Sequence, residues 1–302
     1  MFKYAIDNKR YHTLDYYYKN KYGKKVFKVS LNAFLGCPNQ NKCIYCSEGS
    51  KYFTLDKEVP LKIQFEEGIR VLSKKWKDAL YIGYFQTNTN TYAPLNVLKE
   101  KYEEVLSFPI VGLNIATRSD AISDEVLDYL EDINKRTDLT IELGLQSMHE
   151  KTLKLIRRGH TLSNFEEMVK KLQQRHIKVV VHIINGLPNE TKEDMIETAR
   201  YLNKLHIDGI KIHMLHIIKN TPLAKMYENE PFHVLTKDEY IDIVINQLEF
   251  LDEKMVIHRI TGDPKVDDLI EPKWLIKKFC LLNDIDKEMV RRNTYQGIKK
   301  ES

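Results

Sequence analysis

Short apolar segments recur along this chain, and most are followed by a segment with the apolar periodicity of a helix. Most of the candidate strands begin roughly 30 to 50 residues apart. They span Val26–Leu31, Ala79–Phe85, Ile110–Ala116, Leu139–Leu145, Lys178–Ile184, Gly209–Leu215 and Met255–Ile260. This spacing leaves room for a helix between strands, and such crossovers require parallel strands. We therefore predict an α/β fold with at least six βα units, either doubly wound or curled into a barrel.

The sequence indicates a single domain, with recognisable helix starts and no flexible linker. Capping boxes at Thr191…Asp194 and Thr236…Glu239 mark two helix starts, because each pairs a hydroxyl and a carboxylate with opposing backbone amides. No Gly/Ser/Pro-rich linker divides the chain. In both candidate architectures the functional site lies at the carboxyl ends of the strands. The residues just after each strand are therefore the place to look for chemistry.

Composition excludes several classes of protein. The chain is 42% hydrophobic and 30% charged, which excludes disordered and low-complexity proteins. No apolar run approaches the ~18–20 residues of a membrane span, and the N-terminus lacks the apolar core of a signal peptide. We expect a soluble, cytoplasmic protein that makes no contact with a membrane.

Three of the four cysteines, Cys37, Cys43 and Cys46, lie close together directly after the first candidate strand. They could bind zinc, form a reactive thiol pair or be buried structural residues. They could also hold a [4Fe–4S] cluster with one iron open to the amine and carboxylate of S-adenosylmethionine (SAM). Reductive cleavage of SAM then yields a radical that abstracts hydrogen. Cys280, among apolar neighbours, is expected in the core.

Several further strings make the chain resemble the radical SAM superfamily. Tyr45 precedes the last cysteine, as an aromatic residue usually does in that superfamily. The other strings are 26–33, 85–94, 142–147, 157–160, 186–191, 211–216 and 259–263. Together they resemble the branch of the Elongator catalytic subunit and oxygen-independent coproporphyrinogen oxidase, and above all the bacterial YhcC/YtqA-type family. Two departures are the five residues between Cys37 and Cys43, where three are usual, and Gln86–Asn90 in place of Gly-Gly-Glu.

The resemblance implies a partial (β/α)6 TIM-like barrel of the radical SAM type. We expect a basic, tyrosine-rich extension over 1–25, the barrel with its cluster loop over 26–262, and a basic extension over 263–302. It further implies a [4Fe–4S] cluster on the three clustered cysteines, SAM as cofactor, and a flavodoxin- or ferredoxin-type electron donor. The implied substrate is tRNA, with the wobble-uridine 5-substituent changed from carboxymethylaminomethyl to aminomethyl.

Two other functions remain open from the sequence. One is a radical SAM enzyme acting on a small molecule, as in an oxidative decarboxylation of the porphyrinogen type. The other is a non-enzymatic, zinc-binding RNA module in which Cys280 or a histidine completes the zinc site.

Polar residues at the strand ends supply candidate cofactor contacts. Side-chain amides can bind the amine of the cofactor, and a guanidinium can pair bidentately with its carboxylate. The resemblance adds the turn at 186–188 as a source of backbone amides near adenine. The candidates are Tyr45, Gln86, Asn88, Asn90, Thr117, Arg118, Glu142, Gln146, Arg158, His182 and Gly186. The alternatives are turn hydrogen bonds, an Arg118–Asp120 salt bridge and a core role for His182.

Strand alternation makes Lys211 and His213 the candidate catalytic residues. Both fall on the polar side of a strand whose other side is apolar, so they are expected to face the barrel interior. A buried lysine or histidine facing a cleft can donate a proton or bind an anion. His216 is grouped with Lys211 and His213 at the same strand, and an interior salt bridge is the alternative for Lys211. Arg259, Thr261 and Asp263 are expected at the substrate end of the pocket.

Both ends of the chain are basic. Residues 1–28 hold eight basic and two acidic residues, with six tyrosines between them. Residues 273–302 hold eight basic and four acidic residues. This composition is typical of single-stranded RNA binding, but the tyrosines could instead pack over the bottom of the barrel.

Overall fold

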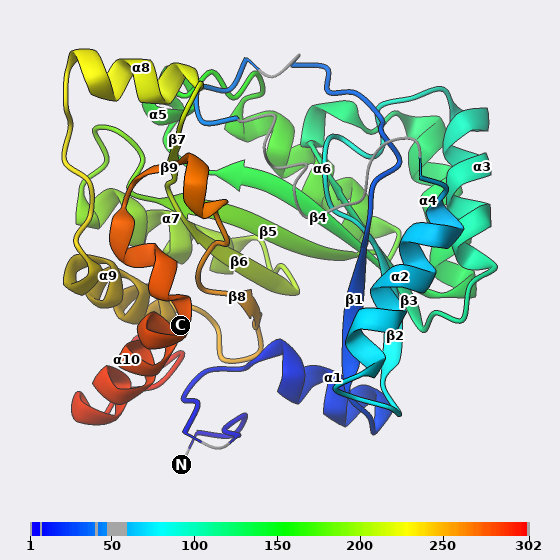
Figure 1. Cartoon of the computed structure of the whole chain (residues 1–302), viewed down its shortest axis with the longest axis horizontal. Helices are drawn as coiled ribbons and strands as arrows, with labels where there is room; N and C mark the ends of the chain where they lie inside the picture. The colour runs from blue at the N-terminus through cyan, green and yellow to red at the C-terminus, as the bar shows by residue number, and fades with distance from the viewer. Residues whose placement is uncertain (1, 7, 40–41, 47–58, 301–302) are drawn as a thin grey trace.

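The computed structural model describes residues 2–6, 8–39, 42–46 and 59–300. Seven parallel strands form one curled sheet, and each strand pairs with the next of the seven in the chain (Figure 1). The strands are β1 (Val26–Leu31), β2 (Leu80–Phe85), β3 (Gly112–Thr117), β4 (Asp138–Gln146), β5 (Lys178–Asn185), β6 (Gly209–Met214) and β8 (Val256–Arg259). All seven expected strands are present with bounds within two residues, so the predicted α/β partial barrel is confirmed.

Helices cover the outer face of this sheet, except for two that lie instead at its carboxyl end, in a separate apolar cluster. These helices together are α2 (Leu61–Ser73), α3 (Leu95–Leu106), α4 (Asp124–Arg136), α5 (Glu150–Leu155), α6 (Leu162–Gln174), α7 (Lys192–Lys204), α8 (Pro222–Asn229) and α9 (Lys237–Phe250). Both predicted capping boxes form, at the starts of α7 and α9. None of the described helices is long and apolar enough to cross a membrane.

Strand alternation divides the side chains between two environments. Val29 and Leu31 of β1 and Leu143 of β4 belong to the apolar core formed with the helices. Polar residues at intervening positions, such as Lys28 and Glu142, point inward and meet each other in the barrel interior. The interior of this barrel is therefore polar at its centre, while its apolar core lies outside the sheet.

The N-terminal segment closes the end of the barrel opposite the cysteine loop. Helix α1 (Leu14–Tyr22) lies below the sheet in Figure 1, while the loop after β1 crosses the top. None of the six tyrosines before β1 is exposed, and Tyr4 stacks on His12. Tyr22 donates a hydrogen bond to Asp138 at the start of β4. Of the two alternatives for these tyrosines, the structure favours packing over RNA stacking.

The C-terminal segment forms β9 (Leu269–Glu271), which pairs with β7 (Ile217–Ile218), and α10 (Lys278–Arg291), which packs against α9. Many of its basic side chains form ion pairs, including Lys278 with Asp263 and Lys300 with Asp252. The expectation for Cys280 was wrong. It is exposed on α10, because the apolar face of that helix passes through Leu281 instead.

Candidate active site at the carboxyl ends of the strands

The cysteine loop is held at the carboxyl end of the sheet by α5 and α8. The Ile44 amide donates to the Ile156 carbonyl at 3.1 Å, and the Leu223 amide donates to the Ile44 carbonyl at 2.9 Å. The Ile44 side chain belongs to a small apolar cluster with Leu153 and Leu223. Cys43, next to this anchor, is 6% exposed. The loop is thus positioned by its backbone and by the Ile44 side chain.

Asn39 and Arg118 lie next to the cysteines. The Asn39 side-chain amide donates to the Cys43 sulfur at 3.1 Å. Burial lowers the pKa of Arg118, but its ion pair with Asp120 and the nearby thiols of Cys37 and Cys43 outweigh burial and raise it. The site therefore combines thiols with a guanidinium that stays charged.

Arg118 is held by Asp120 and still has a buried N–H to offer. Its Nε and Nη2 donate to the two Asp120 oxygens at 2.8 and 2.7 Å. Its Nη1 is buried with no hydrogen-bond partner among the described residues. An orphaned buried donor costs about 1–3 kcal/mol, so a site that keeps one is prepared for an acceptor. The predicted Arg118–Asp120 pair and a ligand-binding role for Arg118 are therefore compatible.

Four further buried polar atoms on this face have no hydrogen-bond partner in the part of the chain that the structure describes. They are Thr87 Oγ1, Asn90 Oδ1, His213 Nε2 and His216 Nε2. They come from the ends of β2 and β6, on the two sides of the barrel. This set of groups fits a cluster with an amino-acid cofactor. The thiols could bind iron, the Arg118 guanidinium could bind a carboxylate, and the polar atoms around them could bind other groups of the cofactor.

The end of β4 has an irregular backbone. Gln146 has φ +80° beside a register shift at 144–146, a strained conformation for a residue other than glycine. Arg158 donates two hydrogen bonds to the Gly144 carbonyl, from Nε at 3.1 Å and from Nη2 at 2.5 Å. A Cβ on Gly144 would lie 2.7 Å from Gln146 Nε2 and 2.8 Å from Arg158 Nη2. Gly144 thus lets both predicted cofactor-binding side chains close over the strand.

Glu142 is the centre of the interior polar network. Lys28 and Asn114 donate to its Oε1 at 2.8 and 3.0 Å. Tyr84 donates to its Oε2 at 2.7 Å, and Lys211 donates to the same atom at 2.5 Å. His182 Nε2 also lies 2.9 Å from Oε2.

These contacts change the expectation for two predicted cofactor ligands. The Glu142 side chain is fully buried and both of its oxygens have partners, so it has no open position for a cofactor. The His182 Nε2 atom lies within hydrogen-bond distance of Glu142 Oε2, so this nitrogen already has a partner inside the network. The sequence analysis missed Lys28, Tyr84 and Asn114, although inward-facing polar residues at matching heights on neighbouring strands were the available signal.

Electrostatics in the network follow from burial. Burial opposes ionisation of Glu142, but the charges of Lys211 and Lys28 hold its pKa well below the usual range. Burial lowers the pKa of Lys211 to about 7 despite Glu142, since Lys28 and Arg259 repel its charge. Lys211 can therefore both give and take a proton near neutral pH.

The two histidines that follow Lys211 are neutral near pH 7. Burial, above all, lowers the pKa of His216 to about 4 and that of His213 well below its usual value. A Cβ on Gly262 would lie 2.4 Å from the His216 ring, so only glycine lets that ring fit. The candidate catalytic residues thus lie where the strand alternation predicted, with Lys211 buried and His213 half-buried, and Lys211 also forms the interior salt bridge that was its alternative.

The remaining predicted cofactor contacts have local partners. Gln86 accepts a hydrogen bond from Ser30 at 2.7 Å. Asn90 donates to the carbonyls of Phe85 and Ala116, joining the loop after β2 to β3. These bonds leave the Asn90 Oδ1 unpaired.

Thr117, Asn88, Gly186 and Tyr45 differ in how much they offer the site. The Thr117 hydroxyl lies 2.5 Å from that of Thr91, whereas Asn88 is exposed. The Gly186 amide donates to the Met195 sulfur at 3.1 Å, so that amide is directed towards α7 and the apolar core outside the sheet. Burial raises the pKa of Tyr45 beyond its usual range.

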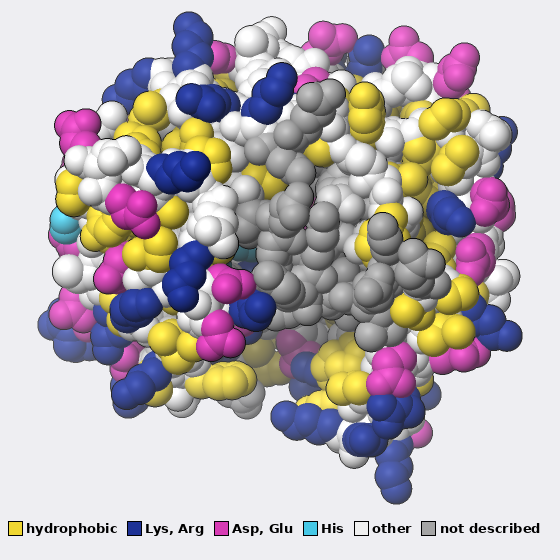
Figure 2. All heavy atoms as spheres, turned by 45° about the horizontal axis from the view of Figure 1, so that its top comes forward, with side chains coloured by type: hydrophobic (Ala, Val, Ile, Leu, Met, Phe, Trp, Pro, Cys, Tyr) yellow, Lys and Arg dark blue, Asp and Glu magenta, His cyan; other side chains and the backbone are white. Residues whose placement is uncertain are grey.

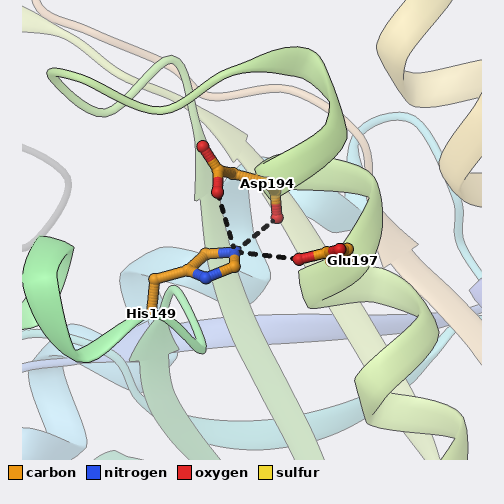
Figure 3. Close-up of side chains that lie close together, drawn as sticks. All are labelled: His149, Asp194 and Glu197. Atoms are coloured by element: carbon orange, nitrogen blue, oxygen red, sulfur yellow. Dashed lines mark hydrogen bonds and ion pairs between the residues drawn. The ribbon is translucent and has the colours of Figure 1, made fainter.

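A separate cluster joins α5 to α7 on the surface: His149, Asp194 and Glu197 (Figure 3). The three side chains are close enough to suggest a metal site. However, His149 Nε2 lies 2.9 Å from the Asp194 backbone carbonyl, to which it can only donate a proton. A donating nitrogen cannot bind a metal, so this contact fastens α5 to α7.

Comparison with known proteins identifies the family. The sequence profile of the Radical SAM superfamily matches residues 31–202, and that of the Radical_SAM C-terminal domain matches residues 207–291. The chain is 44% identical to Uncharacterized protein YtqA of Bacillus subtilis over 304 residues, which cover 98% of this chain and 94% of that protein. It is 30% identical to Protein YhcC of Escherichia coli over 275 residues, 88% of each chain.

More distant similarity covers part of longer proteins. The chain is 26% identical to tRNA uridine(34) acetyltransferase of Methanocaldococcus infernus over 148 residues, 48% of this chain and 27% of that protein. The structure of Methanocaldococcus infernus Elp3 superimposes with a TM-score of 0.69 at 17% identity. It covers 90% of this chain and 64% of that one, and it supports the shared fold.

Superfamily membership implies a [4Fe–4S] cluster and SAM in general terms. It also decides against the non-enzymatic zinc module that the cysteine spacing had left open. The chain belongs to the radical SAM superfamily, and it is a radical SAM enzyme.

Proposed function

We propose that this enzyme holds its cluster on Cys37, Cys43 and Cys46 and remodels the wobble uridine of tRNA. The change is from a carboxymethylaminomethyl to an aminomethyl group at the 5-position. Bound there, the cluster and SAM would supply the radical chemistry for hydrogen abstraction from a carbon beside the nitrogen of that group. A flavodoxin- or ferredoxin-type protein is the proposed electron donor.

The observation that carries the cofactor assignment is the unpaired Nη1 of Arg118 beside the cysteine loop. A guanidinium held on one side by Asp120 presents its other edge as a donor for a carboxylate. SAM carries such a carboxylate on its amino-acid end. Gln146 and Arg158, at the irregular end of β4, are proposed to contact the same cofactor.

The tRNA assignment is supported by the charge around the cysteine loop. Four exposed cations stand on this loop and on the helices that anchor it: Lys42, Lys154, Arg157 and Lys225. Within the described part of the chain, none of the four forms an ion pair. Figure 2 shows Lys and Arg side chains over this end of the molecule. Unpaired cations attract a phosphate backbone, and a more distant relative is named for its action on tRNA uridine 34.

The proposed roles of Lys211 and His213 follow from the proton that the reaction needs. The carbon radical left by hydrogen abstraction must give one electron to the proposed electron-carrier protein, and the resulting imine must take up water. The carbon–nitrogen bond then breaks with its electron pair on nitrogen, and the carboxymethyl arm leaves as glyoxylate. That nitrogen then takes a proton. Lys211, which exchanges protons near neutral pH, is the proposed donor. His213, with an unpaired Nε2, is proposed to orient the polar group of the arm.

The test is a nucleoside analysis of tRNA carrying carboxymethylaminomethyluridine. The enzyme is reconstituted without oxygen and incubated with this tRNA, SAM and dithionite, and digested nucleosides are measured by mass spectrometry. We expect aminomethyluridine to form only with SAM present. Accumulation of 5′-deoxyadenosine beside an unchanged wobble nucleoside would overturn the substrate assignment and favour a small-molecule substrate.

A further inference from the structure

We propose that the barrel interior is a proton path. It connects the active site with solvent at the opposite end of the sheet through Lys211, Glu142, Lys28 and His258. The use of the path rests on the proposed function, because it is the source of the proton that the reaction consumes.

The path is a continuous set of contacts between four strands. Lys211 of β6 donates to Glu142 Oε2 at 2.5 Å, and Lys28 of β1 donates to Glu142 Oε1 at 2.8 Å. Lys28 Nζ lies 3.2 Å from Nδ1 of His258 on β8. Each separation is short enough for a proton to pass along a hydrogen bond. The three contacts lead from the side chain proposed to act on substrate to the amino-terminal half of the barrel.

A cavity of about 370 Å³ begins where this set of contacts ends. His258 lines it, together with Thr140 and Val180 near the starts of β4 and β5. Its lining also includes the exposed residues His206 and Lys254, so the cavity reaches the surface. A cavity of this size, with polar groups such as Thr140 and Asp138 in its lining, has room for several water molecules.

The position of His258 is fixed by its neighbours. A Cβ on Gly209 would lie 2.9 Å from two atoms of the His258 ring, so the absent side chain of Gly209 makes room for the ring. Nδ1 faces Lys28, and the ring also lines the cavity. His258 therefore stands between the cavity and the half-buried ammonium of Lys28.

All the groups on this path can carry a proton, and nearby charges set the preference. Four titratable groups contact Glu142: Lys28 (β1), Tyr84 (β2), His182 (β5) and Lys211 (β6). His258 (β8) and Tyr18 (α1) lie near Glu142, and Arg259 (β8) lies near Lys211. Two lysines share one carboxylate, and Lys211 has a pKa lowered to about 7, with burial the largest cause. Apolar side chains of similar volume would fill the barrel interior with equal or greater stability. The buried charges therefore indicate a role other than filling the interior.

The transfer balances without any electron movement. Lys211 gives a proton to the substrate nitrogen and takes another from Lys28 by way of the Glu142 carboxylate. Lys28 recovers its proton from His258, and His258 takes one from cavity water. One proton crosses the barrel for each turnover.

Hydrogen exchange of the Lys28 ammonium tests the path without substrate or cofactor. The full chain is labelled with ¹⁵Nζ-lysine, and exchange with solvent is measured by NMR in wild type, His258→Gln and His206→Gln. Glutamine at 258 can keep a hydrogen bond to Lys28 but cannot carry a proton. We expect exchange at least about tenfold slower in H258Q and unchanged in H206Q. Equal rates in wild type and H258Q would overturn the path.

Turnover gives a second test. His258→Ala is expected to lower aminomethyluridine formed per 5′-deoxyadenosine about tenfold, and imidazole should restore it through the enlarged cavity. Restoration by methylimidazoles should follow their pKa values. Restoration that follows ring size instead would show a structural role and contradict the path. If wild type modifies no tRNA, the proposed function fails, while the exchange measurement still decides the path.

Discussion

At the scale of single residues, one carboxylate organises the barrel interior. Glu142 accepts hydrogen bonds from side chains on strands β1, β2, β3 and β6, and His182 of β5 contacts it as well. Losing one partner of such a network leaves buried charge uncompensated, which costs about 3–5 kcal/mol. The network therefore holds the curled sheet together and also sets the protonation of Lys211.

Lys211 should make stability rise with pH. Burial disfavours the charge of Lys211 and lowers its pKa from the ordinary 10.5 to about 7 in the folded chain. Between these values the unfolded chain binds more protons than the folded chain, so the free energy of unfolding increases with pH. Urea unfolding of wild type and Lys211→Met should diverge above pH 7, by up to about 1.4 kcal/mol per pH unit. The exposed Lys170→Met is the control, and a constant difference would show that folded Lys211 stays protonated.

The affinity for SAM should depend on the planar guanidinium of Arg118 and not only on its positive charge. Lysine in its place keeps the charge but loses the planar pairing with Asp120 that orients the free edge. We expect Arg118→Lys to bind SAM about tenfold more weakly by calorimetry of the reconstituted enzyme. Arg136→Lys, which changes an exposed pair with Glu103, should bind SAM normally. Equal affinity in both variants would remove Arg118 from the site.

At the scale of elements, the irregular end of β4 positions two predicted cofactor contacts. Gly144→Ala would bring a methyl group within 2.8 Å of Gln146 and Arg158 side-chain nitrogens, which must then move. We expect loss of SAM-dependent 5′-deoxyadenosine formation of about tenfold or more, with a nearly native melting temperature. Gly36→Ala is the matched control, because its Cβ would meet only Tyr92 at an ordinary 3.6 Å. Full activity in Gly144→Ala would contradict this role.

Elements were more predictable from the sequence than contacts between them. Alternation along each strand predicted all seven strands and the inward position of Lys211. It could not predict that Glu142 would bind partners from several strands, because these lie far apart in the chain and meet only when the sheet curls. The tyrosines before β1 and the exposed Cys280 depended in the same way on which face each helix buries.

At the scale of the whole molecule, Lys42, Lys154, Arg157 and Lys225 lie on the cysteine side without an ion pair among the described residues, whereas many side chains of the basic ends are ion-paired. Lys9 pairs with Asp286, and Lys21 pairs with Asp138. RNA should therefore approach over α5 and α8, the helices that anchor the cysteine loop. This position would bring a phosphate backbone next to the radical chemistry.

Two charge-reversal variants of equal net charge test this approach. Lys154→Glu with Lys225→Glu should weaken tRNA binding about tenfold or more and reduce its salt dependence. Lys3→Glu with Lys24→Glu, at the basic N-terminus, should bind within about twofold of wild type. Filter binding at several salt concentrations measures both. The reverse order would place the RNA on the bottom of the barrel.

The most direct test of the account is a cysteine series read by iron content and 5′-deoxyadenosine. Cys37, Cys43, Cys46 and Cys280 are each changed to alanine, and every variant is reconstituted without oxygen and mixed with dithionite and SAM. Because Cys37, Cys43 and Cys46 are proposed to hold the cluster, we expect the first three variants to lose the [4Fe–4S] absorbance and to form no 5′-deoxyadenosine. The exposed Cys280→Ala should behave like wild type. A Cys43→Ala protein that still cleaves SAM, or a Cys280→Ala protein that does not, would contradict the account.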